Sequence, residues 1–167
     1  MTTLMTDMSR PLQLSDLRHW DVFWASLAGV GFLRPAPGTW GSAAALLLWW
    51  FSLAHLLWWQ QALVCGVYFL LSWWTCERIC QRYGLKDASE LVADEVAGLW
   101  LALIFVPKIW WLALLAFALF RLLDIAKPGP IGWLDRNTQG GLGVMLDDML
   151  AGLGTGLLVL AVYVVTL

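Results

Sequence analysis

Residues 120–152 read FRLLDIAKPGPIGWLDRNTQGGLGVMLDDMLAG, and this stretch decides how the chain is organised. It lies between two segments that are apolar enough to face lipid. Its charged side chains are Arg121, Asp124, Lys127, Asp135, Arg136, Asp147 and Asp148. Charges at a membrane boundary are costly and commonly mark functional sites, so we expect the chemistry here. The alternative is a solvated loop whose charges form ordinary ion pairs, and spacing alone does not decide between the two.

The spacing of the first charges predicts a common helix face. Arg121 and Asp124 are three residues apart, and Lys127 continues that face one turn later. Pro128 and Pro130 then end the helix. A cation, an anion and a second cation are therefore expected in a row at one helix end.

A second polar group follows a loop rich in glycine. The loop contains Gly140, Gly141 and Gly143, and the adjacent Asp147 and Asp148 come directly before another apolar run. This order predicts two more carboxylates at the mouth of a second helix.

Composition makes this an integral membrane protein. Of 167 residues, 60% are hydrophobic and thirteen are Trp, and the mean hydropathy is +0.72. We expect one membrane domain over residues 1–167, with residues 1–11 as a disordered tail. A net charge of -2 leaves no basic surface for nucleic acid. The three cysteines form no disulfide framework.

Apolar runs predict an all-α, polytopic helical bundle with four to five membrane segments. The runs cover residues 43–59, 62–75, 91–106, 110–122 and 149–167. Gln60 and Gln61 are interpreted as a tight polar turn, and Leu14 to Leu33 as an interfacial helix. Trp residues near the run ends are expected to form aromatic belts.

The entry to the first run resembles an anion site. Arg34 lies in a loop with two prolines and three glycines, and Thr39 or Ser42 is expected to cap the helix that begins near Trp40. Free backbone N–H groups at a helix start, together with hydroxyls and an arginine, favour anions. The alternative is an ordinary capped membrane helix with a proline-rich entry.

Lys and Arg alternate between the two sides of the predicted bundle. They occur before the first run, after the second and after the fourth, and are absent from the Gln60 turn. The positive-inside rule then places the N-terminus, residues 77–90 and residues 121–148 in the cytoplasm. The polar stretches therefore converge on one membrane face.

Converging carboxylates favour a hard divalent cation, with Mg²⁺ as the expected metal. The candidate metal ligands are Asp94, Glu95, Asp124, Asp147 and Asp148. Of these, Asp94, Glu95, Asp124 and Asp148 are also candidates for direct catalysis, for example as a general base. The candidate phosphate-binding residues are Arg34, Thr39, Ser42, Arg121 and Lys127. Acids, metal and cations at a membrane face suit hydrolysis of a lipid phosphomonoester.

Other chemistries fit the sequence less well. Cys76 and Arg82 have the spacing of a cysteine-phosphatase loop, but the residues between them contain no glycine and are typical of a helix end. His19 and His55 are isolated in apolar surroundings. A transporter or cation pathway remains the alternative function, although its acids should cross the membrane instead of gathering at one face. The acid array of CDP-lipid transferases is absent.

Four blocks resemble, in order, those of the phosphatidylglycerophosphatase A family. They are PAPGTWGS at Pro35–Ser42, VADEVAG at Val92–Gly98, FRLLDIAKPGPI at Phe120–Ile131 and GGLGVMLDDMLAG at Gly140–Gly152. The resemblance runs from Gly31 to the C-terminus. It shows no departure at Thr39, Asp94, Glu95, Arg121, Asp124, Lys127, Asp147 or Asp148. It implies a Mg²⁺-dependent enzyme of the bacterial inner membrane, with its site facing the cytoplasm, that converts phosphatidylglycerophosphate to phosphatidylglycerol.

Overall fold

A computed structural model describes residues 10–85, 88–138 and 140–166. Within these ranges every regular element is a helix, which confirms the all-α prediction. The α-helices are α1 (Trp20–Ala25), α2 (Pro37–Leu48), α3 (Trp58–Tyr83), α4 (Ala93–Ile104), α5 (Trp110–Ala126), α6 (Pro130–Asn137) and α7 (Gly140–Thr166). Shorter turns of other helix types are η1 (Leu14–Arg18), η2 (Val30–Phe32) and η3 (Trp49–Leu53).

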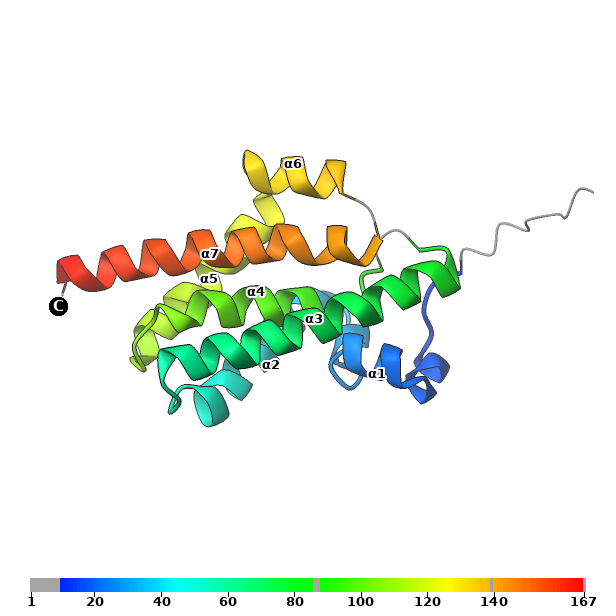
Figure 1. Ribbon diagram of the computed structural model, residues 1–167, viewed down its shortest axis with the longest axis horizontal. Helices are drawn as coiled ribbons and strands as arrows, with labels where there is room; N and C mark the ends of the chain where they lie inside the picture. Colours follow the sequence, from blue (N-terminus) through cyan, green and yellow to red (C-terminus); the bar gives the residue numbers. More distant parts are fainter. Residues whose placement is uncertain (1–9, 86–87, 139, 167) are drawn as a thin grey trace, which may run out of the picture.

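Helices α3, α4 and α7 lie side by side and form the centre of the bundle (Figure 1). Helix α7 runs parallel to α4, because Gly152 packs on the Gly98 backbone and Gly156 packs on the Ala102 backbone one turn further along. A side chain at either position would overlap the carbonyl group of α4, so only glycine permits this approach. The last apolar run thus presents a face of small residues to α4.

Within the described ranges two helices, α3 and α7, are long and apolar enough to cross a membrane. They contain 26 and 27 residues, or about 40 Å each at 1.5 Å per residue, against about 30 Å of hydrocarbon. Helices α2 and α4 contain 12 residues each, which is about 18 Å. By length and composition the structure thus supports two of the four to five expected spans.

Exposed Trp side chains lie at two levels of the bundle. One level has Trp58 and Trp59 in the first turn of α3 and Trp110 in the first turn of α5. At the second level Trp73 and Trp74 are exposed on α3, about 22 Å further along its axis. Indole rings favour the level of the lipid headgroups, so this pattern is typical of two aromatic belts.

Helix α2, the first apolar helix, begins earlier than expected. Pro37 is its first residue and Ala36 precedes it, so neither Thr39 nor Ser42 caps it. Proline is favoured at this position because it has no N–H to satisfy and its φ is already helical. The Ser42 hydroxyl lies inside the helix and donates to the Gly38 carbonyl at 2.8 Å.

The turn between the first two apolar runs lies before the glutamines, which corrects the prediction for Gln60 and Gln61. Both residues belong to the first turn of α3. The Gln61 side chain accepts a hydrogen bond from Trp49 Nε1 at 2.9 Å and donates to the Leu56 carbonyl at 3.0 Å. A polar pair that the sequence presents as a turn thus lies within a helix, where neighbouring groups satisfy the buried Gln61.

Leu14 to Leu33 is not one helix, contrary to the interfacial-helix prediction. It breaks into η1, α1 and η2, because Leu27, Ala28 and Gly29 adopt left-handed backbone conformations. The predicted tail, residues 1–11, falls mostly outside the described residues, but Arg10 is placed and forms an ion pair with Asp16 at 2.7 Å.

The stretch 120–152 contains a helix that the sequence did not reveal. Helix α5 ends at Ala126, and Lys127 has a φ of 43°, which turns the chain sharply into α6. Helix α7 then begins at Gly140, so the glycines form its first turn instead of a loop. Asp147 and Asp148 accordingly lie two turns inside α7.

Candidate active site

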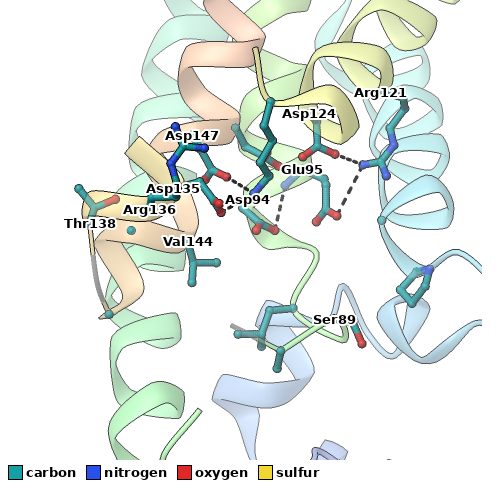
Figure 2. A pocket seen from close by; sticks show the side chains of 18 of the residues that line it. Ser89, Asp94, Glu95, Arg121, Asp124, Asp135, Arg136, Thr138, Val144 and Asp147 are labelled. Atoms are coloured by element: carbon teal, nitrogen blue, oxygen red, sulfur yellow. Dashed lines mark hydrogen bonds and ion pairs between the residues drawn. The ribbon is translucent and has the colours of Figure 1, made fainter. Parts of the chain in front are cut away.

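Asp94 and Glu95 lie in the first turn of α4. The turn is fixed in place because the Val92 N–H donates to the Ala25 carbonyl of α1 at 2.9 Å. Carboxylates are favourable in a first helical turn, where the backbone N–H groups carry partial positive charge. Both acids point into the space between α4, α5 and α7 (Figure 2).

The close crossing of α4 and α7 brings a third acid to this pair. A Cβ on Gly98 would lie 2.5 Å from the Asp148 carbonyl oxygen, so the two backbones are in direct contact at this level. One carboxylate oxygen each from Asp94, Glu95 and Asp148 lie within 4.8 Å of one another. We call these three residues the acid cluster.

Arg121 of α5 faces the acid cluster. Its Nη1 lies 2.5 Å from Asp124 Oδ2 and 3.6 Å from Glu95 Oε1, which confirms that Arg121 and Asp124 share a helix face. The Arg121 Nε is buried and has no hydrogen-bond partner among the described residues. The hydrogen-bonding capacity of this donor is therefore not used by the described protein groups.

Helix α2 contributes space at this point. A Cβ on Gly38 would lie 3.0 Å from both terminal nitrogens of Arg121 and would overlap Glu95 Oε1. The glycine of the PAPGTWGS block thus leaves room for the arginine and the glutamate. The sequence had predicted that this block supplies a helix-capping hydroxyl, from Thr39 or Ser42.

Lys127 occupies a separate corner of the site. Its ammonium donates to Asp135 at 2.5 Å and to Asp147 at 2.7 Å. Burial lowers the pKa of Lys127, but the hydrogen bonds to these two carboxylates outweigh it and raise the pKa above the ordinary value. The left-handed backbone at Lys127 turns it away from Arg121, so the predicted row of three charges is divided into two groups.

These groups line one cavity of about 370 Å³. Six carboxyl groups face it, against three cationic side chains among the described residues. The acids are Asp94, Glu95, Asp124, Asp135, Asp147 and Asp148, and the cations are Arg121, Lys127 and Arg136. A cavity with this excess of negative charge repels a phosphate dianion unless further positive charge is present.

The donor set fits a divalent cation. Glu95 Oε2 and Asp147 Oδ1 are buried without a hydrogen-bond partner among the described residues, which is costly for a carboxylate. Oxygen donors alone, with no histidine or cysteine lining the described part of the cavity, match a hard cation such as Mg²⁺.

The structure separates the predicted residues into two sets. Asp94, Glu95, Arg121, Asp124, Lys127, Asp147 and Asp148 all line the cavity. Arg34, Thr39 and Ser42 do not, and Arg34 instead forms an ion pair with Glu90 at 2.9 Å. Cys76 is buried within the continuous helix α3 and is likewise absent from the lining.

Four polar residues at the cavity were not among the predicted site residues: Ser89, Asp135, Arg136 and Thr138. Asp135 and Arg136 come from α6, whose short, amphipathic sequence after two prolines resembles a loop. The signal that could have revealed them is their charge, since both lie in a stretch flanked by apolar helices.

Comparison with known proteins identifies the family. A sequence model described as Phosphatidylglycerophosphatase A matches residues 23–163. Phosphatidylglycerophosphatase A of Haemophilus influenzae is 37% identical over 135 residues, which cover 80% of this chain and 83% of that protein. The Escherichia coli protein of the same name is 37% identical over 133 residues, or 77% of each chain.

A relative with a different name also aligns. A Bacteroides thetaiotaomicron protein, provisionally named a phosphatidylinositol-3-phosphatase, is 38% identical over 138 residues, which cover 78% of this chain and 86% of that protein. No solved structure matches the chain. The extent of the family match and the identity to its two named members establish that this chain belongs to the phosphatidylglycerophosphatase A family.

Proposed function

We propose that this protein hydrolyses phosphatidylglycerophosphate to phosphatidylglycerol and inorganic phosphate, with Mg²⁺ held by the carboxylates of the cavity. Family membership supports the reaction and the substrate. The observation that carries the mechanism is the excess of carboxylates over cations in a cavity that must accept a phosphate. One divalent cation lowers that excess from three negative charges to one and places positive charge directly beside the carboxylates, where the phosphate is expected to bind.

The acid cluster is the proposed metal site. Asp94, Glu95 and Asp148 would hold the cation, with Asp124 and Asp147 as further candidates nearby. When bound, Mg²⁺ supplies Lewis-acid stabilisation of the phosphoryl oxygens and an activated water. A carboxylate of this set that is not a ligand is placed to accept the proton of the attacking water.

Arg121 is the proposed phosphate-binding cation. Its Nε is unpartnered among the described residues and its Nη1 is held by Asp124, so the guanidinium is oriented with a donor to spare. A planar cation in fixed orientation stabilises the charge that develops on the phosphoryl oxygens in the transition state. Lys127, fixed between two carboxylates, adds a second positive charge at the same cavity. Arg34, Thr39 and Ser42 lie outside the lining, and a role for them in substrate binding stays a prediction.

The proposed location is the bacterial inner membrane, with several membrane segments and the site at the cytoplasmic face. Helices α3 and α7 support two crossings, and α2, α4 and α5 are proposed to supply shorter ones that complete the bundle. The site lies at the bundle end that carries Arg78, Arg82 and Arg121, which by the positive-inside rule faces the cytoplasm.

Phosphate release from phosphatidylglycerophosphate by the purified protein in detergent tests this proposal. We expect turnover with Mg²⁺ and none in excess chelator, with recovery on adding the metal back. Phosphatidylinositol 3-phosphate is the comparison substrate, given the name of the Bacteroides relative. Turnover that persists in chelator would contradict the metal, and failure to cleave phosphatidylglycerophosphate would contradict the substrate.

A further inference from the structure

An apolar groove of about 380 Å³ lies beside the charged cavity. Pro128, Pro130 and Ile131, at the start of α6, form one wall, and Leu150, Leu153 and Leu157 of α7 form the other. The two sites are continuous along the chain, because Lys127 and Asp147 line the cavity while Pro128 and Leu150 line the groove. A polar pocket thus changes to an apolar one within a single helical turn.

The helical register of α7 explains this continuity. Asp147, Leu150, Gly154 and Leu157 are spaced three or four residues apart and so lie on one stripe of the helix. The stripe begins at a carboxylate in the cavity and then runs about 10 Å down the groove, from Leu150 to Leu157. The stripe that begins at Asp148 is buried, because it packs on α4 instead.

Gly154 is the residue that the packing does not explain. Its neighbours Gly152 and Gly156 must be glycine, since α4 lies against them. A Cβ on Gly154 would meet only Leu123 Cδ1, at an ordinary distance of 3.7 Å. Helix packing therefore tolerates a side chain here, and the effect of glycine is to keep the groove open.

We propose that this groove binds an acyl chain of the lipid whose phosphomonoester occupies the charged cavity. The inference rests on the proposed function and adds to it a site for the apolar part of the substrate. A phospholipid has a charged head joined to an apolar chain, in the order that the α7 stripe presents. The groove also lies on a helix long and apolar enough to cross a membrane, where a lipid chain is at hand. A volume of this size lies in the range of small-molecule sites.

The test fills the groove at Gly154 and compares two substrates in one preparation. Gly154→Leu places a branched side chain between the walls, and Gly66→Leu is the matched control. Gly66 is an exposed glycine of α3, and a Cβ added to it would have no neighbour within 4 Å. For each variant, kcat/KM is measured with long-chain phosphatidylglycerophosphate and with its deacylated, water-soluble counterpart. The ratio of the two values does not depend on how much of the protein is active.

We expect Gly154→Leu to lower that ratio about tenfold, the effect of displacing roughly two methylene groups from the groove. Gly66→Leu should leave the ratio at the wild-type value. Should Gly154→Leu fail to accumulate, Gly154→Ala fits the space and should lower the ratio about twofold to threefold.

An unchanged ratio in the Gly154 variants would overturn the groove proposal and leave the proposed function intact. An equal fall of the ratio in Gly66→Leu would also overturn it, because a larger side chain at any exposed position of the bundle would then have the same effect. A wild-type protein that releases phosphate from neither substrate would instead overturn the proposed function, and the groove assignment with it.

Discussion

Arg121 combines two contacts that a lysine cannot reproduce. Its Nη1 lies 2.5 Å from Asp124, and its Nε is buried without a hydrogen-bond partner among the described residues. A guanidinium holds both donors in one rigid plane, whereas an ammonium is a point charge. At the residue scale this arginine should therefore act through geometry as much as through charge.

Arg121→Lys should lower kcat by about 10²-fold, the typical effect of removing one preorganised donor to the transition state. KM should change less, because the lost interaction strengthens as charge develops on the phosphoryl group. Steady-state kinetics in mixed micelles measure both constants. An unchanged kcat would mean that Arg121 is only an anchor at the membrane face.

The acid cluster should bind metal independently of turnover. Asp94→Asn, Glu95→Gln and Asp148→Asn should each weaken Mn²⁺ binding, measured by electron paramagnetic resonance, and lower activity by about 10²-fold or more. Glu90→Gln is the matched control, since Glu90 is also buried but pairs with Arg34 outside the cavity. Wild-type Mn²⁺ affinity in all three cluster variants would contradict the metal site.

Substitution of Cys76 tests the alternative mechanism in which this cysteine is the nucleophile. It is fully buried in α3 and does not line the cavity. Cys76→Ser should keep activity within about twofold of wild type, apart from a modest loss of stability from burying a hydroxyl. Loss of turnover in Cys76→Ser, together with inactivation of the wild type by a thiol reagent, would restore cysteine as the nucleophile.

At the scale of elements, the parallel packing of α4 on α7 determines the site. Asp94 and Glu95 are close to Asp148 because Gly98 and Gly152 allow backbone contact. A displacement of α7 along α4 by one turn would be about 5.4 Å, more than the whole width of the acid cluster. The glycines therefore control catalytic geometry without contacting substrate.

Gly152→Val should lower stability and activity together. Its side chain would overlap the Gly98 carbonyl, and overpacking of this kind costs about 1–3 kcal/mol. Thermal unfolding in detergent and phosphate release are the two measurements, with Gly66→Val as a control on an exposed face. Wild-type behaviour of Gly152→Val would show that the two backbones are not in contact.

The same elements show how far the sequence could predict the structure. The apolar runs predicted α4 and α5 closely, because a proline follows the C-terminal end of each helix, Pro107 after α4 and Pro128 after α5. Helix α6 was missed, since the turn at Lys127 depends on a left-handed backbone that no residue pattern announces. The sequence predicted only that Asp148, Asp94 and Glu95 lie at the same membrane face. Their close approach depends on how α4 and α7 are aligned along their axes, which the contact between Gly98 and Gly152 determines.

At the scale of the whole molecule, the bundle has a strongly charged end and a weakly charged one. The turn between η3 and α3 lies opposite the cavity, beside the first turn of α5, where Lys108 contacts His55 at 2.8 Å. Helix α6, with Asp135 and Arg136, lies at the cavity end. The proposed topology places these two ends on opposite sides of the membrane.

Single cysteines introduced at the two ends test that topology. Asn137→Cys on α6 and Leu57→Cys at the opposite turn replace exposed residues, and the three native cysteines are buried. In intact cells an impermeant thiol reagent should label Leu57→Cys alone, and in inverted vesicles Asn137→Cys alone. The reverse pattern would place the site outside the cytoplasm.

The level of the cavity within the bundle has a kinetic consequence. The cavity extends to the level of Trp73 on α3, because Gly140 lines the cavity and the adjacent Gly141 of α7 packs on the Trp73 and Glu77 backbone. With the site at the headgroup layer, a lipid reaches it by diffusing sideways within one leaflet and never enters bulk water. The relevant substrate concentration is then the mole fraction of the lipid in the surface. Adding inert detergent at constant total substrate dilutes that surface, so the rate falls although the molar concentration has not changed.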